Sequence, residues 1–323
     1  MKQCFLAALV TLCAFLPRVA TAQPPIYLTQ WGTYGTGDGE FAYPQGVAVG
    51  AGGNVYVTDL YNHRVQVFTN SGAYLAQWGM LGSGNGQFIY PRGVAVDASG
   101  NVYVADLYNH RIQVFTSTGA YLTQWGTFGS GNGELYYPQG VAVDALGNVY
   151  VAEQGNNRIQ VFSGGGAYVT QWGTAGTGNG EFQTPIGVAV DAGGSVYVAD
   201  ELNHRIQAFN STGTYLTQWG TPGSGNGQFA YPYGIAVDAG GAVYVVDSSN
   251  NRIQVFTGSG AYLTQWGTAG TGNGEFQYPA AVAVDAYGEV YVADNANHRI
   301  QKFGPPPTPT KKITWGRLKA LYR

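Results

Sequence analysis

Cysteine is nearly absent from this sequence: its two copies, Cys4 and Cys13, both lie within the first 22 residues. That segment has the pattern of a secretory signal, with a short apolar run over residues 5–16 and a small-residue cleavage site at residues 20–22. We expect a signal peptide over residues 1–22, cleavage before Gln23, and a secreted or periplasmic product. The mature chain would contain no cysteine, which excludes disulfides and thiol chemistry.

Charged residues are also scarce, at 10% of the sequence, and their signs are unevenly distributed. Residues 23–303 contain 8 basic and 18 acidic residues, a net charge of 8 − 18 = −10. Residues 304–323 contain five basic residues and no acidic residue, a net charge of +5. Because an acidic surface repels phosphate backbones, we expect no nucleic-acid partner for the main part of the chain.

The C-terminal residues differ in composition from everything before them. Residues 304–310 are rich in proline and predict a stiff, extended linker. The basic tail at residues 311–323 places Trp315 and Leu318 among lysines and arginines, a composition that favours a short amphipathic helix. We therefore expect this tail to associate the protein with the cell envelope.

The motifs of several enzyme classes are missing. No serine stands in a Gly-x-Ser-x-Gly elbow, which leaves covalent hydrolysis without support. No Gly-Lys-Ser/Thr phosphate loop occurs, and each glycine-rich segment, such as residues 35–40, has too few carboxylates for a calcium cage. We expect no cofactor and no metal.

The sequence is rich in exact repetition, and it contains 50 glycines and 24 tyrosines. Arginine, tryptophan and proline each recur every 47 residues without slippage. The positions are Arg64, Arg111, Arg158, Arg205, Arg252 and Arg299; Trp31, Trp78, Trp125, Trp172, Trp219 and Trp266; and Pro44, Pro91, Pro138, Pro185, Pro232 and Pro279. Six copies at a fixed period predict six copies of one structural unit.

Each unit predicts four short strands, which we call a to d. In the second unit they fall at residues 93–97, 101–106, 111–115 and 121–126, with alternating hydrophobicity and glycine-containing turns between them. Four antiparallel strands per repeat are typical of one blade of a β-propeller, so we predict an all-β, six-bladed propeller over residues 23–303.

The two ends of the repeat region indicate how the ring closes. The first repeat-like segment, residues 26–31, is a strand d with no a, b or c before it, and the sixth unit ends after strand c at Phe303. We predict that the N-terminal strand supplies the outer strand of the last blade, because closure removes exposed sheet edges.

The repeated units read Tyr-Val-Ala-Asp-x-x-Asn-His-Arg-Ile-Gln-x-Phe and Tyr-Pro-x-Gly-Val-Ala-Val-Asp. They resemble the NHL-repeat family, in its bacterial secreted form, over about residues 26–303. The resemblance implies a six-bladed propeller. Members of that family include interaction platforms, extracellular sensor domains, RNA-binding domains and a few enzymes, so function has to be argued from the site.

An acidic residue precedes each repeated arginine by five positions. We interpret these twelve residues as structural pairs, because a catalytic arginine would not be needed in every copy. The acidic residues are Asp59, Asp106, Glu153, Asp200, Asp247 and Asp294.

Four histidines, His63, His110, His204 and His298, share one repeat position with Asn157 and Asn251. A zinc site needs three or four converging ligands, whereas these positions are rotated apart around the ring, so we interpret them as loop-fixing residues. By the resemblance, the peptide-amidating and streptogramin lyases carry histidine just after the proline. This chain has none at that position, which reads Gln45, Arg92, Gln139, Ile186, Tyr233 and Ala280.

Positions that differ between repeats are the candidates for recognition. We expect the d–a and b–c loops to share one face, on which Gln45, Arg92, Gln139, Tyr233, Tyr61 and Tyr108 form a ligand-binding channel mouth. The sequence thus predicts a monomeric, non-catalytic platform for a protein, peptide or glycan. Two alternatives remain: a metal-dependent lyase with a divergent site, and a structural component of the cell envelope.

Overall fold

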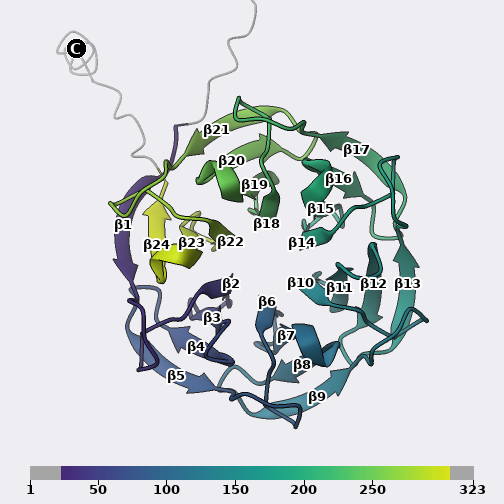
Figure 1. Ribbon diagram of the computed structural model, residues 1–323, viewed down its shortest axis with the longest axis horizontal. Helices are drawn as coiled ribbons and strands as arrows, with labels where there is room; N and C mark the ends of the chain where they lie inside the picture. The colour runs from purple at the N-terminus through teal and green to yellow at the C-terminus, as the bar shows by residue number, and fades with distance from the viewer. Residues whose placement is uncertain (1–22, 306–323) are drawn as a thin grey trace, which may run out of the picture.

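Six four-stranded antiparallel sheets stand around a central axis in the computed structural model, which describes residues 23–305 (Figure 1). Strand a of each sheet lies innermost and strand d outermost. The predicted all-β, six-bladed propeller is therefore confirmed. The predicted signal peptide, the basic tail and nearly all of the proline-rich linker lie outside the described residues. None of the helical turns at residues 23–305 approaches the length and apolar character of a membrane-crossing helix.

The blades are numbered in chain order, and the strands of each are given from a to d. Blade 1 comprises β2 (Pro44–Val49), β3 (Val55–Asp59), β4 (Arg64–Phe68) and β5 (Tyr74–Trp78). Blade 2 comprises β6 (Pro91–Val96), β7 (Val102–Asp106), β8 (Arg111–Phe115) and β9 (Tyr121–Trp125). Blade 3 comprises β10 (Pro138–Val143), β11 (Asn148–Glu153), β12 (Arg158–Ser163) and β13 (Tyr168–Trp172).

Blade 4 comprises β14 (Pro185–Val190), β15 (Val196–Asp200), β16 (Arg205–Phe209) and β17 (Tyr215–Trp219). Blade 5 comprises β18 (Pro232–Val237), β19 (Ala242–Asp247), β20 (Arg252–Thr257) and β21 (Tyr262–Trp266). Blade 6 comprises β22 (Pro279–Val284), β23 (Val290–Asp294), β24 (Arg299–Gly304) and β1 (Ile26–Trp31). Four b–c loops contain a 3₁₀ turn: η1 (Leu107–Asn109), η2 (Glu201–Asn203), η3 (Ser248–Asn250) and η4 (Asn295–Asn297).

Strand a begins at the repeated proline, two residues earlier than the sequence pattern indicates. In blade 2, Pro91 pairs with Asp106 across β6 and β7, and the register then shifts before Val94. Proline has no N–H to donate, so it is tolerated at the first residue of a strand, where the ladder does not yet need that donor.

The hydrophobic core lies between blades rather than within them. All five residues of β7 and of β8 are buried, because alternate side chains point to opposite faces of the sheet and a neighbouring blade covers each face. Trp78 at the end of blade 1 packs against Phe115 of blade 2, with ring centroids 5.6 Å apart. Gly119 lies on the same indole at φ +90°, where an added Cβ would meet it at 2.5 Å.

The repeated arginine connects three parts of each blade. Arg111 is 6% exposed, and its Nε donates to Asp106 Oδ2 at 2.8 Å. Nη1 donates to Ser83 O and Gln124 Oε1, and Nη2 donates to the carbonyls of Gly84 and Gln87, all at 2.8 Å. All five N–H groups therefore have acceptors, and they bind strand b, strand d and the incoming d–a connector together.

The predicted acid–arginine pairs form in all six blades, and in most of them a single arginine nitrogen makes the contact. In five blades only Nε reaches the carboxylate, whereas in blade 3 Arg158 also approaches Glu153 Oε2 with Nη2 at 3.4 Å. The two terminal nitrogens are used instead on connector carbonyls. The arginine thus fixes the d–a connector, while the b–c loop is held by the neighbouring asparagine, such as Asn109, which donates to Asp106 at 2.9 Å.

We expect Arg158→Ala to destabilise the protein by about 3 kcal/mol, because it leaves a buried carboxylate and several carbonyls without their donor. Arg158→Lys keeps the charge but not the five-donor fork, and it should also lower the melting temperature measured by calorimetry. A parental melting temperature for both variants would contradict the structural role of the arginine.

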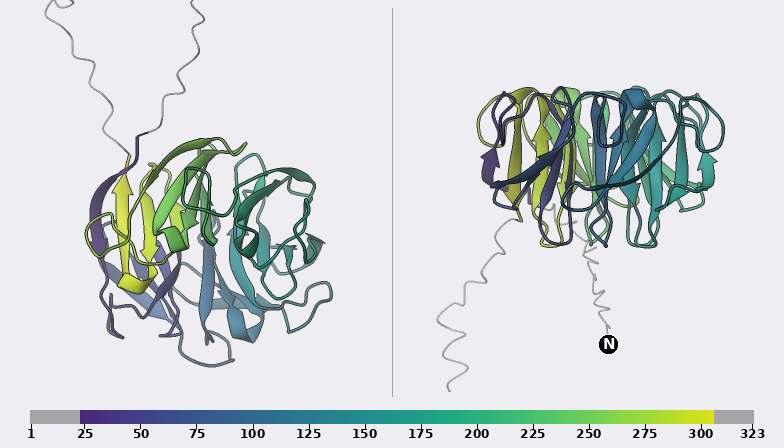
Figure 2. Two further views of the ribbon diagram at one scale, coloured as in Figure 1. Left: turned by 45° about the horizontal axis from the view of Figure 1, so that its top comes forward. Right: turned by 90° about the horizontal axis from the view of Figure 1, so that it is seen from below.

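The N-terminal strand closes the ring as predicted. β1 pairs antiparallel with β24, with Tyr27 opposite Phe303 and Trp31 opposite Ile300. Arg299 Nη1 donates to Gln30 Oε1 at 2.8 Å, so the arginine of blade 6 takes its strand d acceptor from the other end of the described chain. Both described ends leave the ring on the same side (Figure 2).

A mature chain lacking residues 23–32 should aggregate or melt at a markedly lower temperature, because β24 would become an exposed edge strand. Differential scanning calorimetry and light scattering measure both effects. A truncated protein that melts within about 2 °C of the parent would show that closure contributes little.

Candidate functional site

One face of the ring, which we call the loop face, is built by the b–c loops and the ends of the d–a connectors. In blade 1 the backbone amides of Leu60 and Tyr61 donate to the carbonyls of Tyr43 and Ala42, at 3.3 and 3.2 Å. Equivalent contacts occur in the other blades. The two loop types therefore share one face, and the a–b and c–d turns lie on the opposite face.

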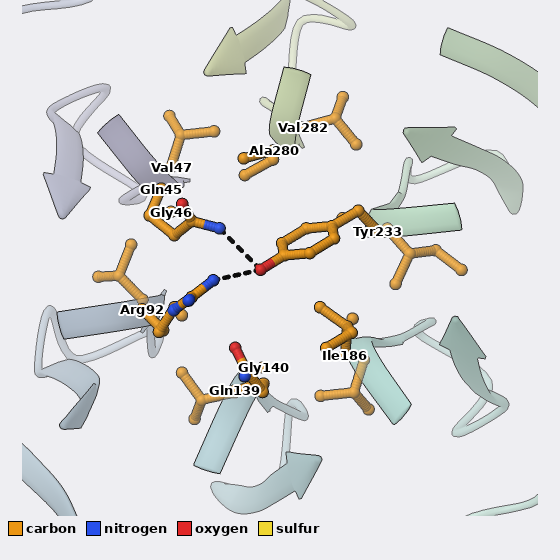
Figure 3. A pocket seen from close by; sticks show the side chains of 18 residues that line it. Gln45, Gly46, Val47, Arg92, Gln139, Gly140, Ile186, Tyr233, Ala280 and Val282 are labelled. Atoms are coloured by element: carbon orange, nitrogen blue, oxygen red, sulfur yellow. Dashed lines mark hydrogen bonds between the residues drawn. The ribbon is translucent and has the colours of Figure 1, made fainter. Parts of the chain in front are cut away.

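The residues that follow the repeated prolines converge at the mouth of the central channel on this face (Figure 3). Tyr233 extends across the channel from blade 5 toward blades 1 and 2. Its hydroxyl accepts a hydrogen bond from Gln45 Nε2 at 2.9 Å and another from Arg92 Nη1. Gln139 and Ile186 point into the same space.

Arg92 differs from the six repeated arginines. Among the seven arginines of residues 23–305, it alone has no carboxylate within ion-pair distance, and it makes one hydrogen bond to protein where Arg111 makes five. Its Nε is buried without a partner among the described residues, as is Gln139 Oε1. Gln139 is 4% exposed, so these two atoms are a buried donor and a buried acceptor at the channel mouth.

A second set of residues escaped the sequence interpretation, and in blades 3 to 6 its members interact with the mouth residues or line the cavity there. It occupies the first position of each b–c loop, directly after the repeated acidic residue: Leu60, Leu107, Gln154, Glu201, Ser248 and Asn295. Gln154 Oε1 accepts a hydrogen bond from Gln139 Nε2, and Asn295 Nδ2 donates to Gln45 Oε1 at 3.0 Å. Their sequence signal was that they vary from blade to blade, although the acidic residue directly before them is repeated in every blade.

The mouth is an internal network rather than a set of freely exposed anchors. Gln45 and Gln139 are buried, and Arg92 and Tyr233 are half-buried. Burial raises the pKa of Tyr233, and the Arg92 charge opposes this rise. Burial likewise raises the pKa of Glu201, again opposed by Arg92. Replacing Arg92 or Tyr233 would therefore disturb a hydrogen-bonded cluster.

The channel mouth opens into a cavity of about 210 Å³ lined by Arg92, Tyr233, Tyr278 and Asn295, among others. A smaller cavity of about 80 Å³, lined by Gln139 and Ile186 as well, lies in the channel itself. The other end of the channel is lined by valine, isoleucine and alanine from all six a strands. Among the residues that line the channel, polar side chains therefore occur only at the mouth on the loop face.

A row of tyrosines runs over blades 1 to 3 on the loop face, and we call it the tyrosine arc: Tyr43, Tyr61, Tyr90, Tyr108 and Tyr137. Successive ring centroids are 5.2–5.4 Å apart, and every pair meets edge to face. Tyr61 and Tyr108 are 53% and 50% exposed. The positions equivalent to Tyr61 in the last four blades are Gly155, Leu202, Ser249 and Ala296, so the arc covers one side of the ring.

Each histidine has a left-handed backbone conformation, and one nitrogen of its ring accepts a hydrogen bond from the backbone that leads into the next blade. His63 has φ +55°, and its Nδ1 accepts a hydrogen bond from the Tyr90 amide at 3.1 Å. Asn157 has φ +52° and does the same with Oδ1, accepting from the Thr184 amide at 3.0 Å. Either histidine or asparagine can occupy this repeat position, because both tolerate the left-handed backbone conformation and both present a hydrogen-bond acceptor. Within residues 23–305 no group of three or more His, Cys, Asp or Glu could hold a metal ion.

Burial lowers the pKa of His63, His110 and His298 below the usual 6.5. The unfolded chain then binds more protons than the folded one as the pH falls below about 6.5, so stability decreases on acidification through that window. We expect a triple variant in which these three histidines become asparagine to lose less stability between about pH 7 and pH 5. Thermal melts of both proteins across this range test the point, and equal slopes would contradict it.

The comparisons with known proteins agree with this architecture. A family model described as NHL repeat matches residues 41–68, 88–115, 135–162, 182–209, 229–256 and 276–303, which together are just over half of the chain. The B-box type zinc finger protein ncl-1 of Caenorhabditis elegans is 44% identical over 50 residues, which are 16% of this chain and 6% of that protein. Protein brain tumor of Drosophila melanogaster is 42% identical over 50 residues, 16% of this chain and 5% of that protein.

Among solved structures, a streptogramin B lyase matches with a TM-score of 0.60 and 15% identity, covering 87% of this chain and 98% of that one. A catalytically inactive virginiamycin B lyase from Staphylococcus aureus, solved with quinupristin, matches with a TM-score of 0.57 and 18% identity, covering 88% and 89%. A Bacteroides thetaiotaomicron protein of unknown function matches with a TM-score of 0.65 and 19% identity, covering 85% and 76%. At these identities the likeness shows the fold alone.

Proposed function

The chain belongs to the NHL-repeat family, and from this premise we propose that it is a non-catalytic binding platform whose ligand meets the loop face. One observation carries the proposal: the tyrosine arc is a continuous row of five aromatic rings, three exposed and two half-buried, on the same face as the channel mouth. The mouth residues and two tyrosines of the arc, Tyr61 and Tyr108, break the sixfold pattern, whereas the other three tyrosines of the arc occupy a position that is tyrosine in five of the six blades.

Tyrosine suits such a surface because its ring gives a rigid apolar contact and its hydroxyl gives a polar tip, at the loss of only two rotatable bonds. Each ring of the arc is held by its neighbours, so little side-chain freedom is left to lose on binding. The acidic composition of the propeller favours a neutral or cationic ligand, which fits a peptide or a glycan better than a polyanion.

The likeness of fold to the streptogramin lyases supports a second candidate, a metal-dependent lyase with a divergent site. Against it stand the absence of histidine after the repeated prolines and the uniform arginines, each of which has a structural set of partners. Metal analysis of purified protein, together with an assay for turnover of any bound ligand, separates this candidate from a platform.

The proposal places the propeller outside the cytoplasm, because residues 1–22 have the pattern of a secretory signal. It also assigns the basic tail to attachment at the cell envelope, since residues 311–323 combine positive charge with Trp315 and Leu318. In this arrangement both described ends leave from the face opposite the loop face, which keeps the loop face accessible (Figure 2).

The arc is tested by Tyr61→Ser combined with Tyr108→Ser, after a peptide and glycan array has supplied a binder. We expect a modest fall in the melting temperature, because each of these half-exposed tyrosines makes two edge-to-face contacts, and such a contact contributes about 0.5–1.5 kcal/mol. Binding should weaken by about 1–2 kcal/mol per tyrosine lost, measured by calorimetric titration.

Tyr287→Ser is the matched control. Tyr287 is 81% exposed and lies in the turn between β22 and β23, on the opposite face. It should bind the same ligand as tightly as the parent. If the control loses as much affinity as the double variant, or if the double variant keeps parental affinity, the loop face is not the binding face.

A further inference from the structure

We propose that the channel mouth recognises a primary carboxamide, such as the side-chain amide of glutamine or asparagine. This inference rests on the proposed function and deepens it, because it assigns a chemical group to the mouth while the tyrosine arc contacts the rest of the ligand. Some polar atoms of the mouth are already paired within the protein, and others are not.

Three groups at the mouth have unused hydrogen-bonding capacity. Arg92 Nε is a buried donor without a partner, and Gln139 Oε1 is a buried acceptor without a partner. Tyr233 accepts two hydrogen bonds through its oxygen, and its hydroxyl hydrogen has no acceptor in the part of the chain that the structure describes. A buried polar atom without a partner is destabilising, so a ligand that supplies partners for these atoms gains binding free energy.

A hydrogen bond to the b–c loop of its own blade fixes the orientation of the Gln139 side chain. Its Nε2 donates to Gln154 Oε1, which leaves its own Oε1 turned toward the mouth as an acceptor. Arg92 is similarly fixed by the bond from Nη1 to Tyr233. The mouth therefore presents two donors, from Arg92 and Tyr233, and one acceptor, from Gln139, in positions set before any ligand arrives.

A primary carboxamide matches this arrangement. Its carbonyl oxygen accepts from Arg92 Nε and from the Tyr233 hydroxyl, and its NH₂ group donates to Gln139 Oε1. A carboxylate has no hydrogen to give Gln139, and it would also face Glu201, whose charge Arg92 already partly offsets. An ammonium group has no acceptor for Arg92. Arg92, Gln139 and Tyr233 together line the cavity of about 80 Å³, and Arg92 and Tyr233 also line the adjoining cavity of about 210 Å³; both exceed the volume of a single water.

A set of host peptides that differ at one residue tests this inference. The tested residues are glutamine, asparagine, glutamate and leucine, placed within the best peptide from the array. We expect the glutamine or asparagine peptide to bind at least tenfold more tightly than its glutamate and leucine counterparts, measured by calorimetry. Free glutamine and N-acetylglutamine methylamide, titrated alongside, show whether a free amino acid or only a peptide-like context supplies the amide.

Gln139→Leu removes the acceptor at nearly constant volume, and it should reduce the amide preference to less than twofold. Ile186→Val is the control, because Ile186 occupies the equivalent position in blade 4 and offers no polar atom. If Gln139→Leu does not fold, Gln139→Met serves instead, and it too should abolish the preference because a thioether is only a weak acceptor.

Two outcomes would overturn this inference and leave the proposed function intact: peptides that bind through the tyrosine arc without any amide preference, and an amide preference that persists in Gln139→Leu. Binding of a glycan instead of peptides, with affinity lost in Gln139→Leu, would show that the mouth reads hydroxyl groups and would also overturn it. Failure of every peptide and glycan to bind the parent protein would overturn both proposals.

Discussion

The structure depends on one buried arginine per blade that has an acceptor for each of its five N–H groups. In blade 2, Arg111 binds the carboxylate of strand b, the glutamine of strand d and three carbonyls of the connector that enters the blade. A lone buried charge would be costly, so the blade forms only when all these parts are in place together. In blade 6 the acceptor on strand d is Gln30, and the same interaction that completes each blade therefore also closes the ring.

This constraint explains why the sequence predicted so much of the fold. Successive repeated arginines, such as Arg64 and Arg111, are always separated by the same interval, because each arginine must meet the same connector. The N-terminal strand Ile26–Trp31 could be assigned to the last blade for the same reason. The channel mouth was predicted less completely. The sequence could locate Arg92 and Tyr233 by their departure from the repeat, but it could not show that they bind each other across the ring, because their separation is set by closure and not by any local pattern.

Positions in the strands maintain the ring, whereas positions in the loops vary between blades. The side chains of strands b and c are buried between neighbouring blades. The positions that can change without disrupting the ring therefore lie in the loops. There the blades have diverged: tyrosines gather over blades 1 to 3, and polar groups gather around the mouth. One loop position varies much less: it is always histidine or asparagine, because the residue there must provide a hydrogen-bond acceptor and adopt a left-handed backbone conformation.

The central claim is that the loop face, with its tyrosine arc and channel mouth, is the recognition surface. A crystal structure of the protein purified from its native source tests this most directly. The account predicts ligand density at the mouth, within hydrogen-bond distance of Arg92 Nε and Gln139 Oε1, and continuing over Tyr61 and Tyr108. Ligand density on the opposite face, against the a–b turns, would contradict it.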